Sequence, residues 1–393
     1  MDKNNKNPEV RFKGFVEDWK IQKLKDVSTY SNGGSFENYV KEFGRYELIT
    51  LKSINMSGKL VHSGRFIDIE TPTLDKGTLV MILSEQAPGL LGMTAQIPTS
   101  NSYVLNQRVA EIRPNQNIDS YFLSMAINKN QPYFSNRGAG SKVQNISKPN
   151  VENYEFSCPL ITEQKQIGAF FQNLDGLITQ HQIKHDKLVI LKKAMLEKMF
   201  PKNGAVVPEI RFKGFTDDWE VKEIDKIANR YDNLRIPIAA NKRIKGKTPY
   251  YGANGIQDYV EGHTHEGEFI LIAEDGANDL KNYPVQYVKG KIWVNNHAHV
   301  LQTKKNIADN NFLKRTISNT NIEPFLVGGG RAKLNAEIMM KIEVKIPTSI
   351  KEQQKIGFYF KNLDTQINLH QTQLDKLKNI KKACLSKMFV AQE

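Results

Sequence analysis

Hydrophobic positions recur every seven residues in two long stretches of the chain, residues 163–200 and 352–389. In the first stretch one series runs through Ile167, Leu174 and Met195, and a second series lies four residues further along. A heptad pattern kept over about five repeats predicts a long helix whose apolar stripe packs as a coiled coil. At about 1.5 Å per residue, each helix would be about 55 Å long.

The stretch that precedes each of these helices follows a different pattern. These two stretches contain short runs rich in β-branched residues and bounded by turn residues, which predicts strands. These runs are residues 46–54, 77–83 and 104–114 in the first stretch and 267–276 and 285–301 in the second. The expected fold class is α+β, with two mixed α/β domains joined by two long antiparallel coiled-coil helices.

The helical stretches are copies of one another, because 21 of their 38 aligned positions are identical at an offset of 189. A second motif also recurs: "PEVRFKGFVEDWK" begins at Pro8 and "PEIRFKGFTDDWE" at Pro208. The residues between motif and helix share little, so two similar frames hold two unlike inserts. We expect domains at 1–160 and 201–345 and helices at 161–200 and 346–393. Arg11 and Arg211, within the repeated motif, are expected to be structural.

A helix with one apolar stripe needs a partner, and the nearest matching stripe is that of the other copy. A pseudo-two-fold axis would pair the helices antiparallel and give the chain a cyclic arrangement. The midpoints of the helices fall near His181 and His370, which we expect to meet and to fix the register.

Composition limits the classes of function. Hydrophobic residues make up 39% and charged residues 25%, which is typical of globular domains. The cysteines, Cys158 and Cys384, are too few for a disulfide framework or a closed zinc site. The N-terminus lacks the apolar core of a secretory signal, so a cytoplasmic location is expected. The net charge of +13 favours a polyanionic partner, most simply a nucleic acid.

Glycine-rich loops with basic, amide and tyrosine side chains occur in both inserts. Such side chains can neutralise phosphates and read base edges, although each loop alone could be a solvated turn. The candidate DNA-binding residues are Arg137, Ser141 and Lys142 in the first insert and Lys242, Arg243, Lys245, Lys247, Tyr250, Asn254, Arg331 and Lys333 in the second.

Motifs for catalysis are weak. The sequence has neither a phosphate-binding G-x-x-x-x-G-K-[ST] loop nor a G-x-S-x-G elbow. The pairs His263–His265 and His297–His299 lack further ligands at metal-site spacing, so structural contacts are expected rather than a metal. Glu343–Lys345 resembles part of a nuclease motif, but no suitable upstream acid accompanies it.

The repeated "RFKGF", "EQ-x-x-IG-x-x-F-x-NLD" and "KK-x-x-L-x-KMF" segments resemble the specificity subunits of type I restriction–modification systems. "ITLKSIN", "LNQRVAEIRP", "YYGANGIQDYV" and "WVNNHAHVL" resemble segments of that family's target recognition domains. The resemblance implies that each insert reads one half of an asymmetric bipartite site in double-stranded DNA. It implies that the helices set the spacer length.

The same resemblance implies a non-catalytic chain that recruits two methyltransferase subunits and, through them, restriction subunits. S-adenosylmethionine, ATP and Mg²⁺ would then belong to those partners, and this chain would hold no cofactor. Lys192, Lys193, Lys381 and Lys382, expected on outward helix faces, are candidates for the partner interface. Two alternatives remain: a stand-alone sequence-specific DNA-binding protein and a protein scaffold without a DNA role.

Overall fold

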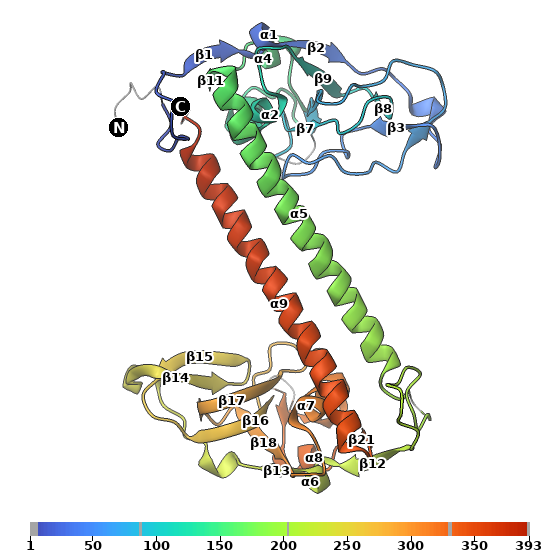
Figure 1. The fold of residues 1–393 in the computed structure, drawn as a ribbon, viewed down its shortest axis with the longest axis vertical. Coiled ribbons are helices and arrows are strands. Elements are labelled where there is room, and N and C mark those ends of the chain that lie inside the picture. Colours follow the sequence, from blue (N-terminus) through green and yellow to red (C-terminus); the bar gives the residue numbers. More distant parts are fainter. Residues whose placement is uncertain (1–6, 86–88, 203, 329–331, 391–393) are drawn as a thin grey trace. The chain divides into compact units, whose positions relative to one another are not determined.

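Two long helices run through a chain that forms two compact units. The computed structural model describes residues 7–85, 89–202, 204–328 and 332–390. The first unit comprises residues 1–181 with 373–393, and the second comprises residues 182–372. The two long helices predicted from the heptads are α5 (Ile161–Lys198) and α9 (Ile350–Lys387), and each contributes residues to both units (Figure 1).

The helices are antiparallel within each unit. In the first unit Phe171 packs against Phe389, with ring centroids 5.9 Å apart, and Lys381, eight residues before Phe389, pairs with Asp175, four after Phe171. In the second unit Phe200 packs against Phe360 in the same way, also at 5.9 Å. The antiparallel pairing expected from the sequence is therefore confirmed in each unit.

The described residues of the first insert form four small sheets and short helices (Figure 1). The sheets are β1 (Lys20–Lys23) with β11 (Glu155–Cys158); β2 (Ser28–Asn32), β9 (Val109–Pro114), β5 (Leu79–Ile82) and β7 (Thr94–Gln96); β4 (Phe66–Ile67), β3 (Tyr46–Ile49) and β8 (Tyr103–Leu105); and β6 (Ser84–Glu85) with β10 (Gln144–Asn145). The helices are α1 (Leu24–Val27), η1 (Glu37–Tyr39), α2 (Ser120–Lys129), α3 (Gln131–Ser135) and α4 (Lys148–Glu152).

The second unit is built around one six-stranded sheet. Its strand order is β13 (Ala228–Arg230), β18 (Ala298–Thr303), β16 (His265–Ala273), β17 (Val285–Val294), β14 (Lys245–Gly252) and β15 (Gly255–Val260). Two further pairs are β12 (Trp219–Glu223) with β21 (Glu343–Pro347) and β19 (Leu326–Val327) with β20 (Lys333–Leu334). The helices are α6 (Ile224–Ile227), η2 (Asp232–Leu234), η3 (Ala240–Lys242), α7 (Asn310–Asn319), η4 (Glu323–Phe325) and α8 (Ala336–Met340).

Each unit buries aromatic residues from both repeated blocks in one core. The first core contains Trp19, Phe122, Phe171 and Phe389, and the second contains the corresponding Trp219, Phe312, Phe360 and Phe200. Phe389 and Phe200 come from the "KMF" ends of the helices. Each insert therefore completes its core with the start of one long helix and the end of the other. This requirement explains why the "KMF" motif occurs at the end of both helices.

The repeated "RFKGF" motif is tied to the helix starts by ion pairs. Arg11 donates two hydrogen bonds to Glu163, at 2.9 and 2.7 Å, and Arg211 donates two to Glu352, both at 2.7 Å. Both glutamates are buried. A bidentate pair of this kind fixes the motif against the start of the long helix of its unit, which agrees with the structural role expected for these arginines.

The "EQ-x-x-IG" motif holds the first long helix of each insert. Gln164 accepts a hydrogen bond from the backbone N–H of Asp119 (2.9 Å), and Asp119 caps helix α2. A Cβ atom on Gly168 would lie 2.3 Å from the Asp119 carboxylate, so the position has room only for glycine. The second unit repeats these contacts between Gln353 and Asp309, which caps helix α7.

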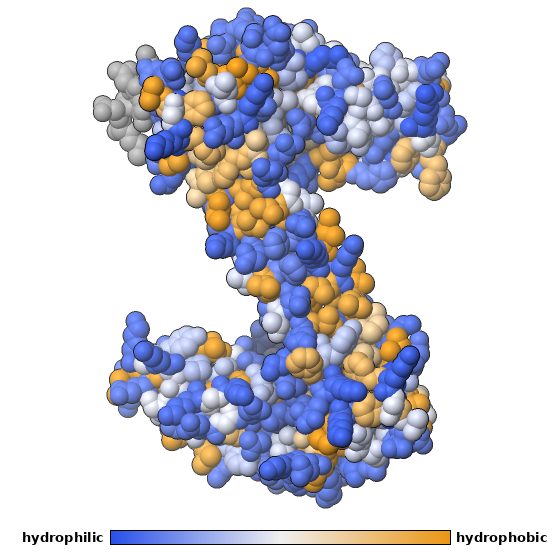
Figure 2. All heavy atoms as spheres, in the orientation of Figure 1, coloured by the Kyte–Doolittle hydropathy of each residue, from blue (hydrophilic) through white to orange (hydrophobic). Residues whose placement is uncertain are grey.

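The surface is mostly polar, but hydrophobic side chains gather over the two long helices (Figure 2). Ile190 is 69% exposed, and Leu177, Ile183, Val189 and Leu191 on the same helix are also exposed. Among the described residues, no helix is both long enough and apolar enough to span a bilayer.

Candidate nucleic-acid interface

Two neighbouring strands of the first unit run parallel and end at the same edge. Leu48 and Ile49 of β3 pair with Val104 and Leu105 of β8. Residues 50–52 follow β3 directly, and residues 106–108 follow β8. Ligands of α/β sheets commonly bind outside the carboxyl ends of parallel strands, so this edge is a candidate site.

A cavity of about 250 Å³ opens at this edge, and its walls are strongly basic. Lys52 and Arg108 come from the two strand ends, and Arg65 lies beside them. Among the described residues, these three side chains make no hydrogen bond or ion pair. Three cations without a protein partner in one concave site are suited to an anionic ligand such as nucleic acid.

The backbone at Arg108 is held in a conformation that side chains rarely adopt. Its φ is 65°, in the left-handed region. The backbone N–H of Leu83 donates a hydrogen bond to the carbonyl of Arg108 (3.0 Å) and helps to hold this conformation. Strained residues cluster at functional sites, and here the strain lies at the edge of the basic cavity.

Glu37 orients the amide side chains of the cavity. It accepts hydrogen bonds from Asn106 (3.0 Å) and Gln107 (2.7 Å), and also from Ser35 (3.0 Å). Burial opposes ionisation, but these bonds and its own backbone N–H lower the pKa of Glu37 to about 2. A permanent carboxylate thus keeps the two amides in one orientation, with the oxygen of Gln107 available to a ligand.

The second unit has a corresponding strand edge with different chemistry. Tyr250 and Tyr251 of β14 pair in parallel with Trp293 and Val294 of β17. Asn254 and Asn295 follow these strands. Asn254 donates to the carbonyl of Gly276 (2.9 Å), and Asn295 accepts from the backbone N–H of His297 (2.8 Å). This edge therefore presents the amide of Asn254 and a histidine, with Asn295 buried behind them, instead of three free cations.

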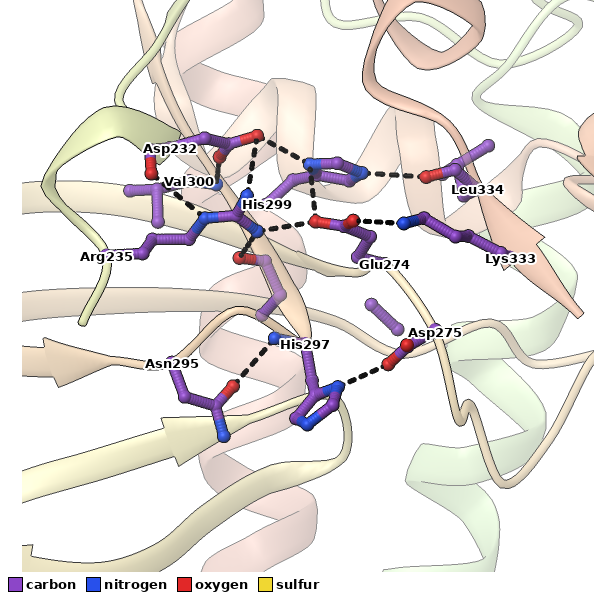
Figure 3. Close-up of polar contacts among 12 residues, drawn as sticks. Asp232, Arg235, Glu274, Asp275, Asn295, His297, His299, Val300, Lys333 and Leu334 are labelled. Carbon is purple, nitrogen blue, oxygen red and sulfur yellow. Dashed lines mark hydrogen bonds and ion pairs between the residues drawn. The ribbon is translucent and has the colours of Figure 1, made fainter. Parts of the chain in front are cut away.

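His297 is half-exposed at that edge and is oriented by a carboxylate. Its Nδ1 lies 2.5 Å from Asp275 (Figure 3). This contact leaves Nε2 for a further hydrogen bond.

Three residues beside this edge have the composition of a metal site: Asp232, Glu274 and His299. His299 is buried between Asp232 (2.6 Å) and the carbonyl of Leu334 (2.8 Å). Lys333 and Arg235 contact the two oxygens of Glu274, at 2.9 and 2.6 Å (Figure 3).

Although burial alone would raise the pKa of Glu274, the hydrogen bonds from Lys333 and Arg235 lower it below its ordinary value. The carboxylate is thus already neutralised by protein cations. The cluster is an ion network that joins η2, β18 and β20 to Glu274, which directly follows β16.

Several residues predicted to bind DNA have partners inside their unit. Tyr250 is only 1% exposed, and its ring lies 4.2 Å from the guanidinium of Arg243. Arg243 also donates to the carbonyl of Ile238, and Lys333 belongs to the ion network. Tyr250 cannot reach a base without leaving the core, which corrects the prediction of a direct contact. Its ring packs against Arg243, and its hydroxyl accepts a hydrogen bond from the backbone N–H of Ile238.

The other predicted residues fall into two groups. Ser141, Lys142, Lys242, Lys245 and Lys247 are exposed, and so is Arg137, which stacks on Tyr133 at 3.9 Å. Their contacts with DNA stay predictions. Arg331 lies outside the described residues.

Two of the four helix lysines do not lie on an outward face. Lys381 contacts Asp175 at 2.7 Å, and Lys192 contacts Asp364 at 2.6 Å, so both bridge the helices. This corrects their assignment to a partner surface, whereas Lys193 and Lys382 are exposed. His181 belongs to the first unit and His370 to the second, so their meeting stays a prediction.

Lys52, Arg65, Arg108 and Glu37 were not among the residues predicted from the sequence. Two of them lie in the segments "ITLKSIN" and "LNQRVAEIRP", which were recognised as typical of target recognition domains. The missing signal was that both segments end parallel strands, which only the pairing of β3 with β8 reveals.

Comparison with known proteins adds to this geometry. The family model described as "Type I restriction modification DNA specificity domain" matches residues 16–188 and again residues 216–379. The chain belongs to this family. Its two copies of the domain coincide with the two inserts and their following helices.

Individual relatives agree with the family. The chain is 47% identical over 146 residues to S.HindORF215P of Haemophilus influenzae, named as a candidate type I restriction enzyme specificity subunit. The match covers 37% of each chain. It is 25% identical over 120 residues to the type I restriction enzyme MjaVIII specificity subunit of Methanocaldococcus jannaschii, covering 29% of this chain and 28% of that one. The chain thus matches about a third of the length of these two relatives.

The fold is shared over the whole chain with a solved structure. The S subunit of a type I restriction–modification system from M. genitalium superposes with a TM-score of 0.73 and 16% identity. The match covers 98% of this chain and 100% of that one. At this identity the likeness shows the fold alone.

Proposed function

We propose that this chain is the DNA specificity subunit of a type I restriction–modification complex and that it catalyses no reaction itself. The observation that carries the proposal is the pair of strand-edge sites, one in each copy of the specificity domain. The sites occupy corresponding positions but carry different side chains. Two binding sites with different side chains in one chain suit a bipartite DNA sequence whose two halves differ.

In the first unit, Arg65 and Arg108 are suited to guanine, whose O6 and N7 accept a bidentate hydrogen bond from arginine. Gln107, oriented by Glu37, offers its amide to a neighbouring base. In the second unit, the exposed Asn254 and the half-exposed His297 are suited to hydrogen bonds with donors and acceptors on base edges, and the buried Asn295 supports His297 by accepting from its backbone N–H. The exposed lysines around both sites would neutralise backbone phosphates.

The helices α5 and α9 would set the number of base pairs between the two halves. Each helix has 38 residues and contributes to both units. Such a helix is about 57 Å long. A continuous helix is stiff, so its length would be transmitted to the spacing of the recognised halves.

Two methyltransferase subunits, and through them restriction subunits, would be the partners. S-adenosylmethionine, ATP and Mg²⁺ would be bound by those subunits. The exposed apolar residues of α5, including Ile190, are suited to a protein interface because burying them releases water. Lys193 and Lys382 lie on the same helices and would contribute at its rim.

The test is co-expression of this chain with a type I methyltransferase subunit, followed by mapping of methylated bases in the host DNA. We expect one asymmetric bipartite sequence. Exchange of residues 20–160 for the corresponding insert of a relative should change one half of that sequence only. Tight, specific DNA binding by the chain alone, without any methyltransferase assembly, would instead favour a stand-alone DNA-binding protein. Absence of salt-dependent DNA binding would favour a scaffold without a DNA role.

A further inference from the structure

The second unit contains a basic cavity that the strand-edge site does not use. Its volume is about 310 Å³, and it lies where strand β17 and helices α7 and α9 face one another. Lys314 and Arg315 come from α7, Lys361 and Asp364 from α9, and Gln286 and Tyr287 from β17.

Positive charge exceeds negative charge in this cavity. Asp364 is the carboxylate in its wall, and it pairs with Lys192 (2.6 Å), with Arg315 and, at 3.9 Å, with Lys314. Lys361 stacks over the ring of Tyr287 at 5.2 Å. Burial, with the like charges of Arg315 and Lys192, lowers the pKa of Lys314 to about 8 against the pull of Asp364.

Arg315 lines this cavity and has an unsatisfied donor. The residue is 5% exposed, and its Nε is buried without a hydrogen-bond partner among the described residues. A buried donor without an acceptor is unfavourable. A guanidinium that lacks part of its hydrogen bonding, in a cavity with excess cations, is the arrangement that receives an oxyanion.

The repeated frame does not require these cations. Asp175 is the counterpart of Asp364 in the first unit, and it bonds to Tyr121 and Lys381. The positions that correspond to Lys314 and Lys361 are Ser124 and Gln172. Lys314 and Arg315 belong to the second insert, whereas Lys361 lies on the repeated helix α9, where the first copy has a glutamine. The excess charge is therefore specific to the second unit.

The cavity adjoins the strand edge of the same unit. A Cβ atom added to Gly255 would lie 3.3 Å from Gln286, which lines the cavity. Gly255 is the first residue of β15 and directly follows Asn254, which lies in the turn between β14 and β15. We propose that this cavity binds a backbone phosphate of the DNA half-site that the second unit reads.

This proposal rests on the proposed DNA-reading function and adds a contact that gives affinity and register without reading a base. A phosphate diester has two free oxygens, which suits the donors of Arg315, Lys314 and Lys361 together. The proximity to Asn254 favours DNA over an acidic side chain of a protein partner, which is the competing outcome of the test.

The first experiment compares Lys314→Gln and Lys361→Gln with Lys351→Gln in the complex with the methyltransferase subunit. Lys351 is exposed on the same helix and lies outside the cavity, so it is a matched control for charge. Each cavity variant should reduce the slope of log affinity against log salt by about 0.9 and weaken binding about fivefold at 0.15 M salt. The preferred sequence should not change. Slopes equal to that of Lys351→Gln would overturn the proposal.

The second experiment uses duplexes with a single neutral methylphosphonate at each backbone position of the second half-site. One position should weaken binding by the wild-type complex and have little effect on Lys314→Gln. If no position shows this dependence, the cavity does not bind a backbone phosphate. A different result is that Lys314→Gln no longer assembles with the methyltransferase subunit while the salt slope of DNA binding is unchanged. That result would show that the cavity binds an acidic side chain of the protein partner instead. A wild-type complex without any specific DNA binding would contradict the proposed function itself.

Discussion

Lys381 donates hydrogen bonds to both oxygens of Asp175, 206 residues earlier in the chain, at 2.7 and 2.8 Å. Lys192 and Asp364 form the equivalent pair in the second unit. The two aspartates are related by the sequence repeat, as are the two lysines. Each unit thus closes its helix pair with an aspartate from one copy and a lysine from the other.

Replacing Lys381 by methionine should destabilise the first unit by about 1–3 kcal/mol, because it leaves the carboxylate of Asp175 with fewer partners in a largely buried site. Urea unfolding of Lys381→Met, Asp175→Asn and the double variant would measure the coupling of the two residues. Lys382→Met is the control, since Lys382 is exposed beside it. Additive effects of the two single variants would show that the contact contributes nothing.

Two glycines of helix α5 should respond in opposite directions to alanine. Gly168→Ala should destabilise, because the added Cβ would lie 2.3 Å from the carboxylate that caps helix α2. Gly176→Ala should stabilise by about 0.5–1 kcal/mol, since nothing lies within 4 Å of the added atom and alanine favours the helix. Thermal unfolding of both variants would measure the difference. Equal shifts would contradict the close packing at Gly168.

Removing the cations of the first cavity should affect one half-site only. Arg65→Gln and Arg108→Gln should each weaken binding by about 1–3 kcal/mol and relax the preference for a base pair of the half-site read by the first unit. Lys25→Gln, an exposed lysine outside the cavity, is the control. Binding to duplexes randomised in one half at a time would show the effect. If affinity fell equally for all sequences, these arginines would contact backbone phosphates and would not read bases.

The buried Lys314 should make stability depend on pH. Its pKa in the folded protein is about 8, below the 10.5 of an unperturbed lysine. The unfolded state therefore binds more protons between these values, and the free energy of unfolding should rise as the pH increases from about 8 toward 10.5. The groups that face Lys314 are Lys192, Arg315 and Asp364.

Urea unfolding of the wild type and of Lys314→Met at pH 7 and pH 10 would measure this dependence. The variant should be the more stable protein at pH 7, and the advantage should shrink at pH 10. A constant difference between the two proteins would show that Lys314 does not titrate in this range.

Lengthening the helices should lengthen the spacer of the recognised site. Insertion of one helical turn near residue 181, with a matching turn in α9, adds about 5.4 Å. We expect methylated sites with the same two halves and one to two additional base pairs between them. An insertion of equal length in an exposed loop of either insert is the control. An unchanged spacer would show that the length of the helices does not set the distance between the two half-sites.

The frame of the fold could be predicted because its signals are local in the sequence. Heptad spacing places residues such as Ile167 and Leu174 on one face of a helix whatever surrounds it. The duplication then identified the packing partner of this helix. The same apolar stripe recurs at Ile356 and Leu363 of the second helix, so the two stripes can pack against each other. The recurrence of Arg11 as Arg211 separated structural residues from variable ones in the same way.

The candidate DNA-binding sites could not be predicted as well from the sequence, because each site depends on which strands lie next to one another in the fold. Basic residues in glycine-rich loops were visible in the sequence, but Tyr250 lies in the core and Lys333 belongs to an ion network. Lys52 and Arg108 are 56 positions apart in the sequence, and no periodicity relates them. Only the parallel pairing of β3 and β8 brings them to one edge.

The sequence by itself thus determined the two helices, their antiparallel pairing within each unit and the duplicated motifs that anchor the inserts. The tertiary structure decided which cations stay free for a ligand and which are used by the protein. The physical reason is that helical periodicity depends on residues a few positions apart, whereas the availability of a charge depends on every side chain that folding brings within reach of it.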